Sequence, residues 1–384
     1  MLTSRINFTN FKFKKKKTLV NKKLKILLNE NSEILKSLGK NYKNSYNKKI
    51  LTKFKKNTNF RIFGMGGSIL GAQTIYQFLR KKIKKNFVFV DNLQINENKF
   101  ENKKFTNIVI SKSGNTIETI VNSNIYIKKE DKNIFITEDK KNYLYLLAKK
   151  LKAEIIHHNN FIGGRYAVLS EVGMLPAELM GLNPEYFKQF NHLIKNKKFL
   201  NELTSNVASI LHYIKNKKYN SIIINYDDKS ENLFKWYQQL VAESLGKKKK
   251  GLLPIISNMP KDNHSVMQLY LDGFQNNFFT FFYVNEKNSK KINNSQILKK
   301  FKFLKNKNLS NVIYAQKKAS ENIFKRKKIP FRSFEIKRRD EKSLGELFCF
   351  FMLETILLGM CLNLNPYNQP AVELIKKEPK KILF

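Results

Sequence analysis

The sequence is poor in cysteine, with only Cys349 and Cys361 among 384 residues. Both fall in one segment of helical character, where twelve residues of helix would separate them by ~18 Å along the axis. A disulfide cannot span that distance. We therefore expect two reduced, buried thiols and a protein of a reducing compartment, the cytoplasm. A secretory signal is not expected either, because the lysines within 11–17 interrupt any apolar run near the start.

Several cofactor and catalytic motifs are also missing. The sequence contains no Cys/His spacing typical of a metal site, no Walker A sequence, no GxGxxG and no nucleophile elbow. Acid–base chemistry without a metal, a nucleotide or any other cofactor is therefore the simplest prediction.

Acidic residues are scarce relative to basic ones. Asp and Glu number 30 against 73 Lys and Arg, which gives a formal net charge of +43. Nucleic-acid or membrane binding is one interpretation; a composition biased toward Lys, Asn, Ile and Phe is the other. Because the lysines are spread along the chain and no zinc-finger or RNP1-like motif accompanies them, we favour the second and expect no specific nucleic-acid partner. A field this positive should still attract anionic sugar phosphates.

Only one long apolar run is present, at 347–364. Glu354 lies near its middle, and an ionised carboxylate there would cost ~2.5–3.5 kcal/mol in a bilayer. The run therefore predicts a helix buried between layers of the protein, and we expect no membrane partner.

Shorter apolar runs alternate with segments of helical length in two series. This alternation predicts an α/β fold in which parallel sheets are covered by helices on both faces. The first series of expected strands is 59–64, 87–91, 107–111, 133–137 and 154–158. The second series is 221–226, 252–257, 278–284, 311–315 and 331–336.

These series suggest two domains that are distant structural repeats, although no repeat is visible residue by residue. The expected organisation is a helical N-terminal arm (1–58), a first domain (59–182), a polar crossover (183–200) and a second domain with C-terminal helices (201–384).

Two glycine- and hydroxyl-rich turns are the most informative motifs. GMGGS at 64–68 and SKSGNT at 111–116 each follow an expected strand and precede an amphipathic segment. In that setting, backbone N–H groups at a helix start can face an anion, and glycines let the backbone approach it closely. One Gly-Ser turn alone is weak evidence, but two in the same context favour a phosphate site.

Four further clusters carry candidate chemistry, each with an ordinary structural alternative. Arg165 follows two glycines and could hold an oxyanion, although a surface arginine is common. Glu243 ends an apolar helix and is a candidate general base or a solvated residue. His264 lies in a helix-start pattern and can exchange protons near neutral pH, although a lone histidine is more often structural. Gln369 and Lys376 lie in a late basic segment, where lysines are usually solvated.

Together these clusters resemble the phosphoglucose isomerase family, whose members contain paired SIS-type (sugar isomerase) domains. The likeness covers residues 59–378 and rests on six blocks in family order. The blocks are GMGGSILGA, SKSGNTIET, GGRYAVLSEVGMLP, QQLVAESLGK, NHS…Q and NPYNQPAVELIK.

The resemblance implies two SIS-type domains and interconversion of glucose 6-phosphate and fructose 6-phosphate through a cis-enediolate, a step of glycolysis and gluconeogenesis. Carried over by motif, Glu243 moves the proton, Arg165 stabilises the enediolate, and His264 with Lys376 opens the sugar ring. The residues implied to bind substrate are Gly67, Ser68, Ser111, Lys112, Ser113, Thr116, Glu118 and Gln369. The resemblance also implies no cofactor and no metal. It further implies a homodimer in which His264 reaches the neighbouring subunit's site.

Three alternatives stay open at this point. The GMGGS and SGNT motifs are similar to those of dual phosphoglucose/phosphomannose isomerases. On this alternative the protein would also accept mannose 6-phosphate. A sugar-phosphate-binding SIS regulator without catalysis is the second alternative, and a nucleic-acid-binding protein the third. Within the family pattern, Ala371 and Ile375 replace expected glycines close to Lys376.

Overall fold

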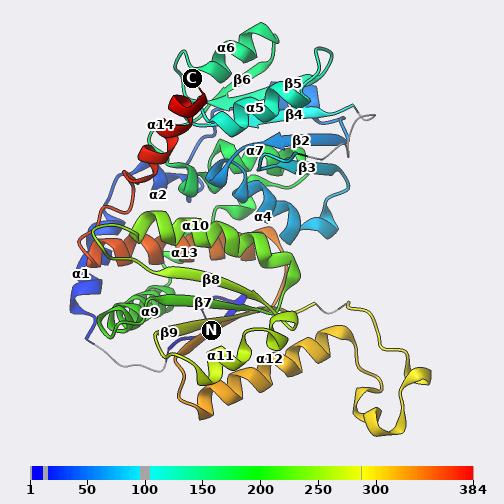
Figure 1. The fold of residues 1–384 in the computed structure, drawn as a ribbon, viewed down its shortest axis with the longest axis vertical. Helices are drawn as coiled ribbons and strands as arrows, with labels where there is room; N and C mark the ends of the chain where they lie inside the picture. Colours follow the sequence, from blue (N-terminus) through cyan, green and yellow to red (C-terminus); the bar gives the residue numbers. More distant parts are fainter. Residues whose placement is uncertain (1, 12–15, 96–103, 287, 384) are drawn as a thin grey trace.

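The computed structural model describes residues 2–11, 16–95, 104–286 and 288–383, which form two five-stranded sheets separated by a layer of helices (Figure 1). The first sheet is entirely parallel, with the order β3-β2-β4-β5-β6. Its strands are β2 (Asn59–Phe63), β3 (Asn86–Val90), β4 (Thr106–Ile110), β5 (Lys132–Thr137) and β6 (Glu154–His157). All five lie within about one residue of the predicted runs, which confirms this half of the predicted fold.

The second sheet has the order β1-β10-β9-β7-β8, and its first strand is antiparallel to the rest. Its strands are β1 (Ile6–Thr9), β7 (Asn220–Asn225), β8 (Leu253–Asn258), β9 (Asn277–Val284) and β10 (Phe331–Ile336). Four of the five predicted runs are confirmed as strands. The N-terminal arm, predicted to be helical, also contributes β1, whose Ile6 and Phe8 are buried against the sheet.

The predicted strand at 311–315 is wrong, because these residues lie in helix α12 (Leu309–Arg326). Asn308 and Asn311 form a reciprocal capping box at the start of this helix. A short apolar run has no periodicity that separates strand from helix, so the capping signal should have decided the prediction.

The two sheets share one topology. In each, the second strand of the series lies on one side of the first strand, while the third and fourth strands lie on the other side. The side on which successive strands are added therefore reverses between β2 and β4 in the first sheet and between β7 and β9 in the second, although each of these pairs is parallel. Such reversal points open a crevice beyond the carboxyl ends of the strands.

Helices α10 (Glu231–Leu245) and α13 (Glu341–Cys361) lie between the two sheets (Figure 1). Among the described residues, α13 is the one helix long and apolar enough to cross a membrane by length and composition, but 94% of its most apolar window is buried. Its Glu354 accepts hydrogen bonds from Arg332, Asn206 and Tyr237, all buried. Pairing of this kind makes a buried carboxylate tolerable inside a protein.

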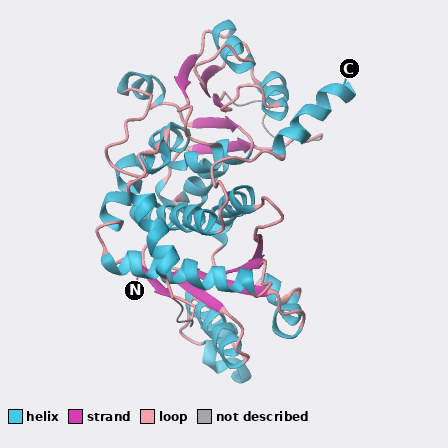
Figure 2. Ribbon diagram, turned by 90° about the vertical axis from the view of Figure 1, so that its left-hand side faces the viewer, coloured by secondary structure: helices cyan, strands magenta, loops and turns pink. Residues whose placement is uncertain are grey.

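Of the remaining helices, some pack inward, as α4 (Leu70–Phe78) does against α10 and α7 (Glu171–Leu179), and the others cover the outside of the molecule and the ends of the chain. Figure 2 shows the C-terminal helix projecting from the body. These remaining helices are α1 (Thr18–Leu28), α2 (Glu33–Ser37), α3 (Lys48–Phe54), α4 (Leu70–Phe78), α5 (Ile117–Tyr126), α6 (Tyr143–Lys150), α7 (Glu171–Leu179), α8 (Phe190–Leu193), α9 (Lys197–Lys215), α11 (Met267–Asp272) and α14 (Val372–Leu383). The domain boundaries proposed from sequence stay predictions.

Candidate active site

The two glycine- and hydroxyl-rich turns lie side by side at the reversal point of the first sheet. The 64–68 turn follows β2 and the 111–116 turn follows β4, and these strands are parallel neighbours. Helices α4 and α5 follow the turns, so both helix starts face the same crevice. Within the second turn, the hydroxyl oxygens of Ser111 and Thr116 are 2.9 Å apart.

Gly67 brings the first turn against the segment that carries Arg165. A Cβ at Gly67 would lie 2.1 Å from the carbonyl carbon of Gly164, so no larger residue fits without moving one of the two backbones. Arg165 itself belongs to the short 3₁₀ helix Gly164–Leu169 and is 1% exposed. This contact places a buried guanidinium beside the predicted phosphate turns.

The Arg165 guanidinium donates five hydrogen bonds to two parts of the chain, residues 243–244 and 366–369. Its Nε donates to the Ser244 hydroxyl (2.8 Å) and its Nη1 to Glu243 Oε2 (3.2 Å). Nη1 also donates to the side-chain oxygen of Gln369, and Nη2 to the carbonyl oxygens of Pro366 (2.7 Å) and Asn368 (3.2 Å). A planar fork bound on every side has one orientation only.

Glu243 lies in the last turn of α10, with 26% of its side chain exposed. Gln239, one turn earlier, donates to Glu243 Oε1 (3.0 Å). A Cβ at Gly66 in the first turn would lie 2.6 Å from Gln239 Nε2, so Gln239 also contacts the predicted phosphate site. The sequence analysis missed Gln239, although residues four apart on a helix share one face and the spacing from Glu243 could have identified it.

The structure places the other predicted substrate residues at the second turn with different exposures. Ser113 is exposed and Glu118 is half-buried in the first turn of α5. Lys112 donates to the carbonyl oxygen of Asn160 (2.7 Å) and lies 3.6 Å from Glu138. Burial lowers the pKa of Lys112, and Glu138 opposes this shift. Its predicted contact with phosphate stays a prediction.

One predicted catalytic residue is not brought to this cluster within one chain, and the side chain of another is not described. His264 ends the 3₁₀ helix Lys261–His264 after β8, is exposed, and makes no hydrogen bond or ion pair with Arg165 or Glu243 among the residues described. Lys376 falls within α14, but its side chain lies outside the described part of the structure. In the described ranges, no group of three or more His, Cys, Asp or Glu is arranged to hold a metal ion.

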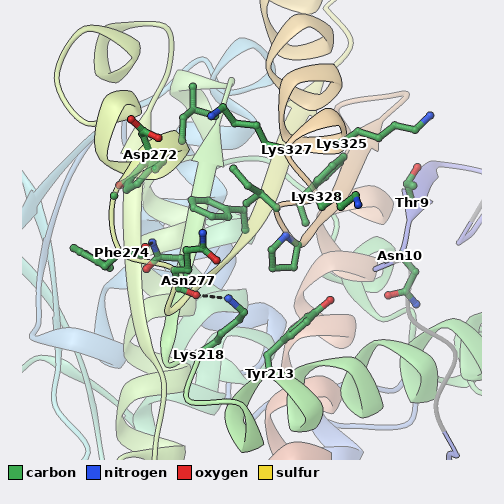
Figure 3. A pocket seen from close by; sticks show the side chains of 18 residues that line it. Thr9, Asn10, Tyr213, Lys218, Asp272, Phe274, Asn277, Lys325, Lys327 and Lys328 are labelled. Atoms are coloured by element: carbon green, nitrogen blue, oxygen red, sulfur yellow. Dashed lines mark hydrogen bonds between the residues drawn. The ribbon is translucent and has the colours of Figure 1, made fainter.

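A cavity of about 850 Å³ lies elsewhere, at the amino ends of β9 and β10 (Figure 3). Lys218, Lys325, Lys327 and Lys328 line it together with Asp272. Helices α9, α11 and α12 all end beside it, and helix C-termini carry partial negative charge. The lysines offset these charges, so this cavity is a poorer phosphate site than the helix starts at the two turns.

The duplicated topology, with helices on both faces of each sheet, places the molecule among α/β proteins built from paired SIS-type domains. A hypothetical protein from Thermus thermophilus has a similar fold, with a TM-score of 0.82 at 19% identity over 95% of this chain and 94% of that one. A glucose-6-phosphate isomerase from Chlamydia trachomatis gives a TM-score of 0.68 at 17% identity, covering 91% of this chain and 73% of that one.

The sequence comparisons define the family. The chain belongs to the phosphoglucose isomerase family, whose model, described as "Phosphoglucose isomerase", matches residues 33–383. It is 30% identical over 343 residues to the glucose-6-phosphate isomerase of Methanocaldococcus jannaschii, covering 83% of this chain and 82% of the relative. It is 32% identical over 354 residues to that of Mycoplasmopsis pulmonis, covering 84% and 82%.

Proposed function

We propose that this member of the phosphoglucose isomerase family interconverts glucose 6-phosphate and fructose 6-phosphate, with Glu243 as the base. The observation that carries the proposal is the Glu243 carboxylate, partly open to solvent and 3.2 Å from the buried Arg165 guanidinium, next to the Gly66–Gly67 turn. The relatives named above support the substrate pair.

The phosphate end of the sugar binds at the two turns. The helix starts of α4 and α5 and the hydroxyls of Ser68, Ser111 and Thr116 supply donors for a dianion. Binding energy gained at this remote group fixes the reacting carbons over Glu243.

Glu243 then moves one proton between neighbouring carbons. Its carboxylate takes the proton from C2 of the open-chain aldose, and the electron pair passes to the carbonyl oxygen to form a cis-enediolate. The proton of the C2 hydroxyl moves to the oxygen on C1, and the same carboxyl group returns its proton to C1 as the C2 carbonyl forms, which gives the ketose. Arg165 meets the negative charge on the enediolate with a guanidinium already fixed by its five hydrogen bonds, so little reorganisation is needed at the moment of reaction.

The Glu243→Gln substitution tests this assignment. The amide keeps the size of the side chain and a hydrogen bond to Arg165 but cannot accept the proton, so kcat should fall by roughly 10³-fold or more while sugar phosphate still binds. Turnover is measured by coupling glucose 6-phosphate to a dehydrogenase, and binding by calorimetry. Glu231→Gln, on the exposed start of the same helix, is the matched control and should keep full activity. Full activity of the Glu243 variant would refute the mechanism.

We also propose that the active unit is a homodimer in which His264 serves the neighbouring site. His264 is exposed and makes no hydrogen bond or ion pair with Glu243 among the described residues of one chain. Large apolar side chains are also exposed, on the projecting segment after β9 (Figure 1) and on α14. They are Leu298 (73%), Phe303 (68%), Ile375 (75%) and Ile382 (81%). A second copy that covers such side chains would remove an unfavourable exposed surface.

Subunit mixing tests the shared site. His264→Ala and Glu243→Gln homodimers should each be nearly inactive. Unfolding and refolding an equal mixture should restore about a quarter of wild-type activity, since half the dimers are mixed and each has one intact site. Restored activity supports the exchange of His264, whereas a mixture as inactive as its parents would exclude it.

A further inference from the structure

A tight turn beyond α10 presents two lysines to the segment after α13. Lys247 and Lys250 pair as an antiparallel bridge, and the residues between them, Lys248 (φ 52°) and Lys249 (φ 58°), both have left-handed backbones. That conformation is unfavourable for a residue with a side chain. Backbone strain of this kind collects at functional sites, where the surrounding structure holds it in place.

The two ammonium groups bind consecutive parts of one loop. Lys250 Nζ donates to the carbonyl oxygen of Leu362 (3.1 Å), at the end of α13, and Lys247 Nζ donates to that of Asn365. The residue after Asn365 is Pro366, whose carbonyl oxygen accepts from Arg165 and from the Tyr166 hydroxyl (3.0 Å). The bonds from Arg165 to Asn368 and Gln369 follow directly. Lys247 and Arg165 therefore donate hydrogen bonds to neighbouring carbonyl oxygens of the same 365–369 segment.

We propose that Lys247 is a positioning residue that holds the 365–369 segment against Arg165, so that Gln369 and the guanidinium keep one arrangement at the reacting carbons. This inference rests on the proposed roles of Arg165 and Glu243. Without the Lys247 bond, Asn365 keeps no other hydrogen bond to α10 or its turn among the described residues. The segment beside the site would then be held by the bonds from Arg165, by the Tyr166 hydroxyl and by the bond from Tyr367 to Glu30.

The charge of Lys247, as well as its position, contributes to the proposed role. Burial, together with the positive charge of Arg165, lowers the pKa of Lys247 to about 8, while Glu243 opposes the shift. Arg165 and Glu243 are the charged groups that act on Lys247 from the helices. The 362–369 segment contributes carbonyls, and its one titratable side chain, Tyr367, donates instead to Glu30 (2.8 Å). A protonated Lys247 makes a charge-assisted bond to Asn365 and adds positive charge beside the enediolate, and both are lost as pH rises through about 8.

Three variants of the full-length enzyme test the proposal. Lys247→Met keeps the side-chain length without the charge, and kcat should fall by about tenfold to a hundredfold through misplacement of the segment. KM for fructose 6-phosphate should change by less than about threefold, because the phosphate turns are untouched. Lys247→Arg keeps a charged donor and should restore most of kcat. Lys248→Met, an exposed neighbour on the same turn, should match the wild type.

The pH profile separates positioning from a merely structural role. Wild-type kcat should fall on the alkaline side with an apparent pKa near 8, toward the level of Lys247→Met, while Lys247→Met and Lys247→Arg should both lack this limb. A Lys247→Met enzyme with wild-type kcat and an unchanged alkaline limb would overturn the proposal. That result combined with an inactive Glu243→Gln enzyme would leave the proposed function intact, so the two failures are distinguishable.

Discussion

The two sheets reverse their strand order at equivalent points, yet the two crevices contain opposite chemistry. Beyond β2 and β4, turns rich in glycines and hydroxyls lead into the starts of α4 and α5, where an anion is favoured. Beyond β7 and β9, the chain places two carboxylates, Asp227 and Glu286. The duplicated topology supplies two sites of the same shape, so topology alone does not decide which of them binds a ligand.

Arg339 bridges the two carboxylates of the second crevice. Its guanidinium donates to Asp227 Oδ1 (2.6 Å) and to Glu286, and contacts the carbonyl oxygen of Phe78 at the end of α4 (3.4 Å). Glu286 also accepts from Lys81 (2.8 Å), just beyond α4. Burial alone would raise the pKa of Glu286, but the bonds from Lys81 and Arg339 outweigh it and hold the value at about 2. The second crevice thus ties the sheets together, whereas the first is the one we propose for substrate.

Removing the Arg339 guanidinium should give the largest effect in this comparison, a loss of stability. Arg339→Met leaves Asp227, only 6% exposed, without its cationic partner, and should lower the free energy of unfolding by about 3–5 kcal/mol. KM for fructose 6-phosphate should not change below the melting temperature, because the substrate crevice is unaltered. Urea unfolding and steady-state kinetics measure the two quantities.

A double variant checks that the loss comes from the unpaired carboxylate. Asp227→Asn combined with Arg339→Met removes both charges and should recover part of the lost stability, since a buried charge without a partner costs more than a missing pair. A double variant at least as unstable as Arg339→Met alone would show that Arg339 stabilises the protein by packing rather than by charge.

Much of the fold could be predicted from sequence because buried parallel strands are short runs of β-branched and aromatic residues bounded by polar turns. β2 and β4 are of this kind. β1 was missed because four residues beside a lysine-rich stretch give too short a pattern, and its place depends on pairing with β10, more than 300 positions away. The strand predicted at 311–315 failed for the related reason that a short apolar run fits a capped helix equally well.

The candidate site could be predicted only where its chemistry is local. The turns and Glu243 are visible in sequence because each combines the required residue types within a few positions. The fixed orientation of Arg165 depends on Pro366 and Gln369, about 200 positions later, and the bond from Lys247 to Asn365 spans 118 positions. The pairing of Arg339 with the carboxylates of the second crevice is equally non-local, since Asp227 lies 112 positions before it.

A smaller effect, on KM rather than on stability, should follow when the first crevice loses its hydroxyls. Ser111→Ala combined with Thr116→Val removes both members of one hydrogen-bonded pair, so no buried donor is left unpaired. KM for fructose 6-phosphate should rise about tenfold with kcat nearly unchanged, because a phosphate contact stabilises ground state and transition state alike. Ser230→Ala, which removes the hydroxyl that binds Asp227 in the second crevice, should leave KM unchanged. Only the crevice that binds phosphate should lose substrate affinity when a hydroxyl donor is removed from it. An unaltered KM in the first variant, or a raised KM in Ser230→Ala, would therefore contradict the assignment of phosphate binding to the first crevice.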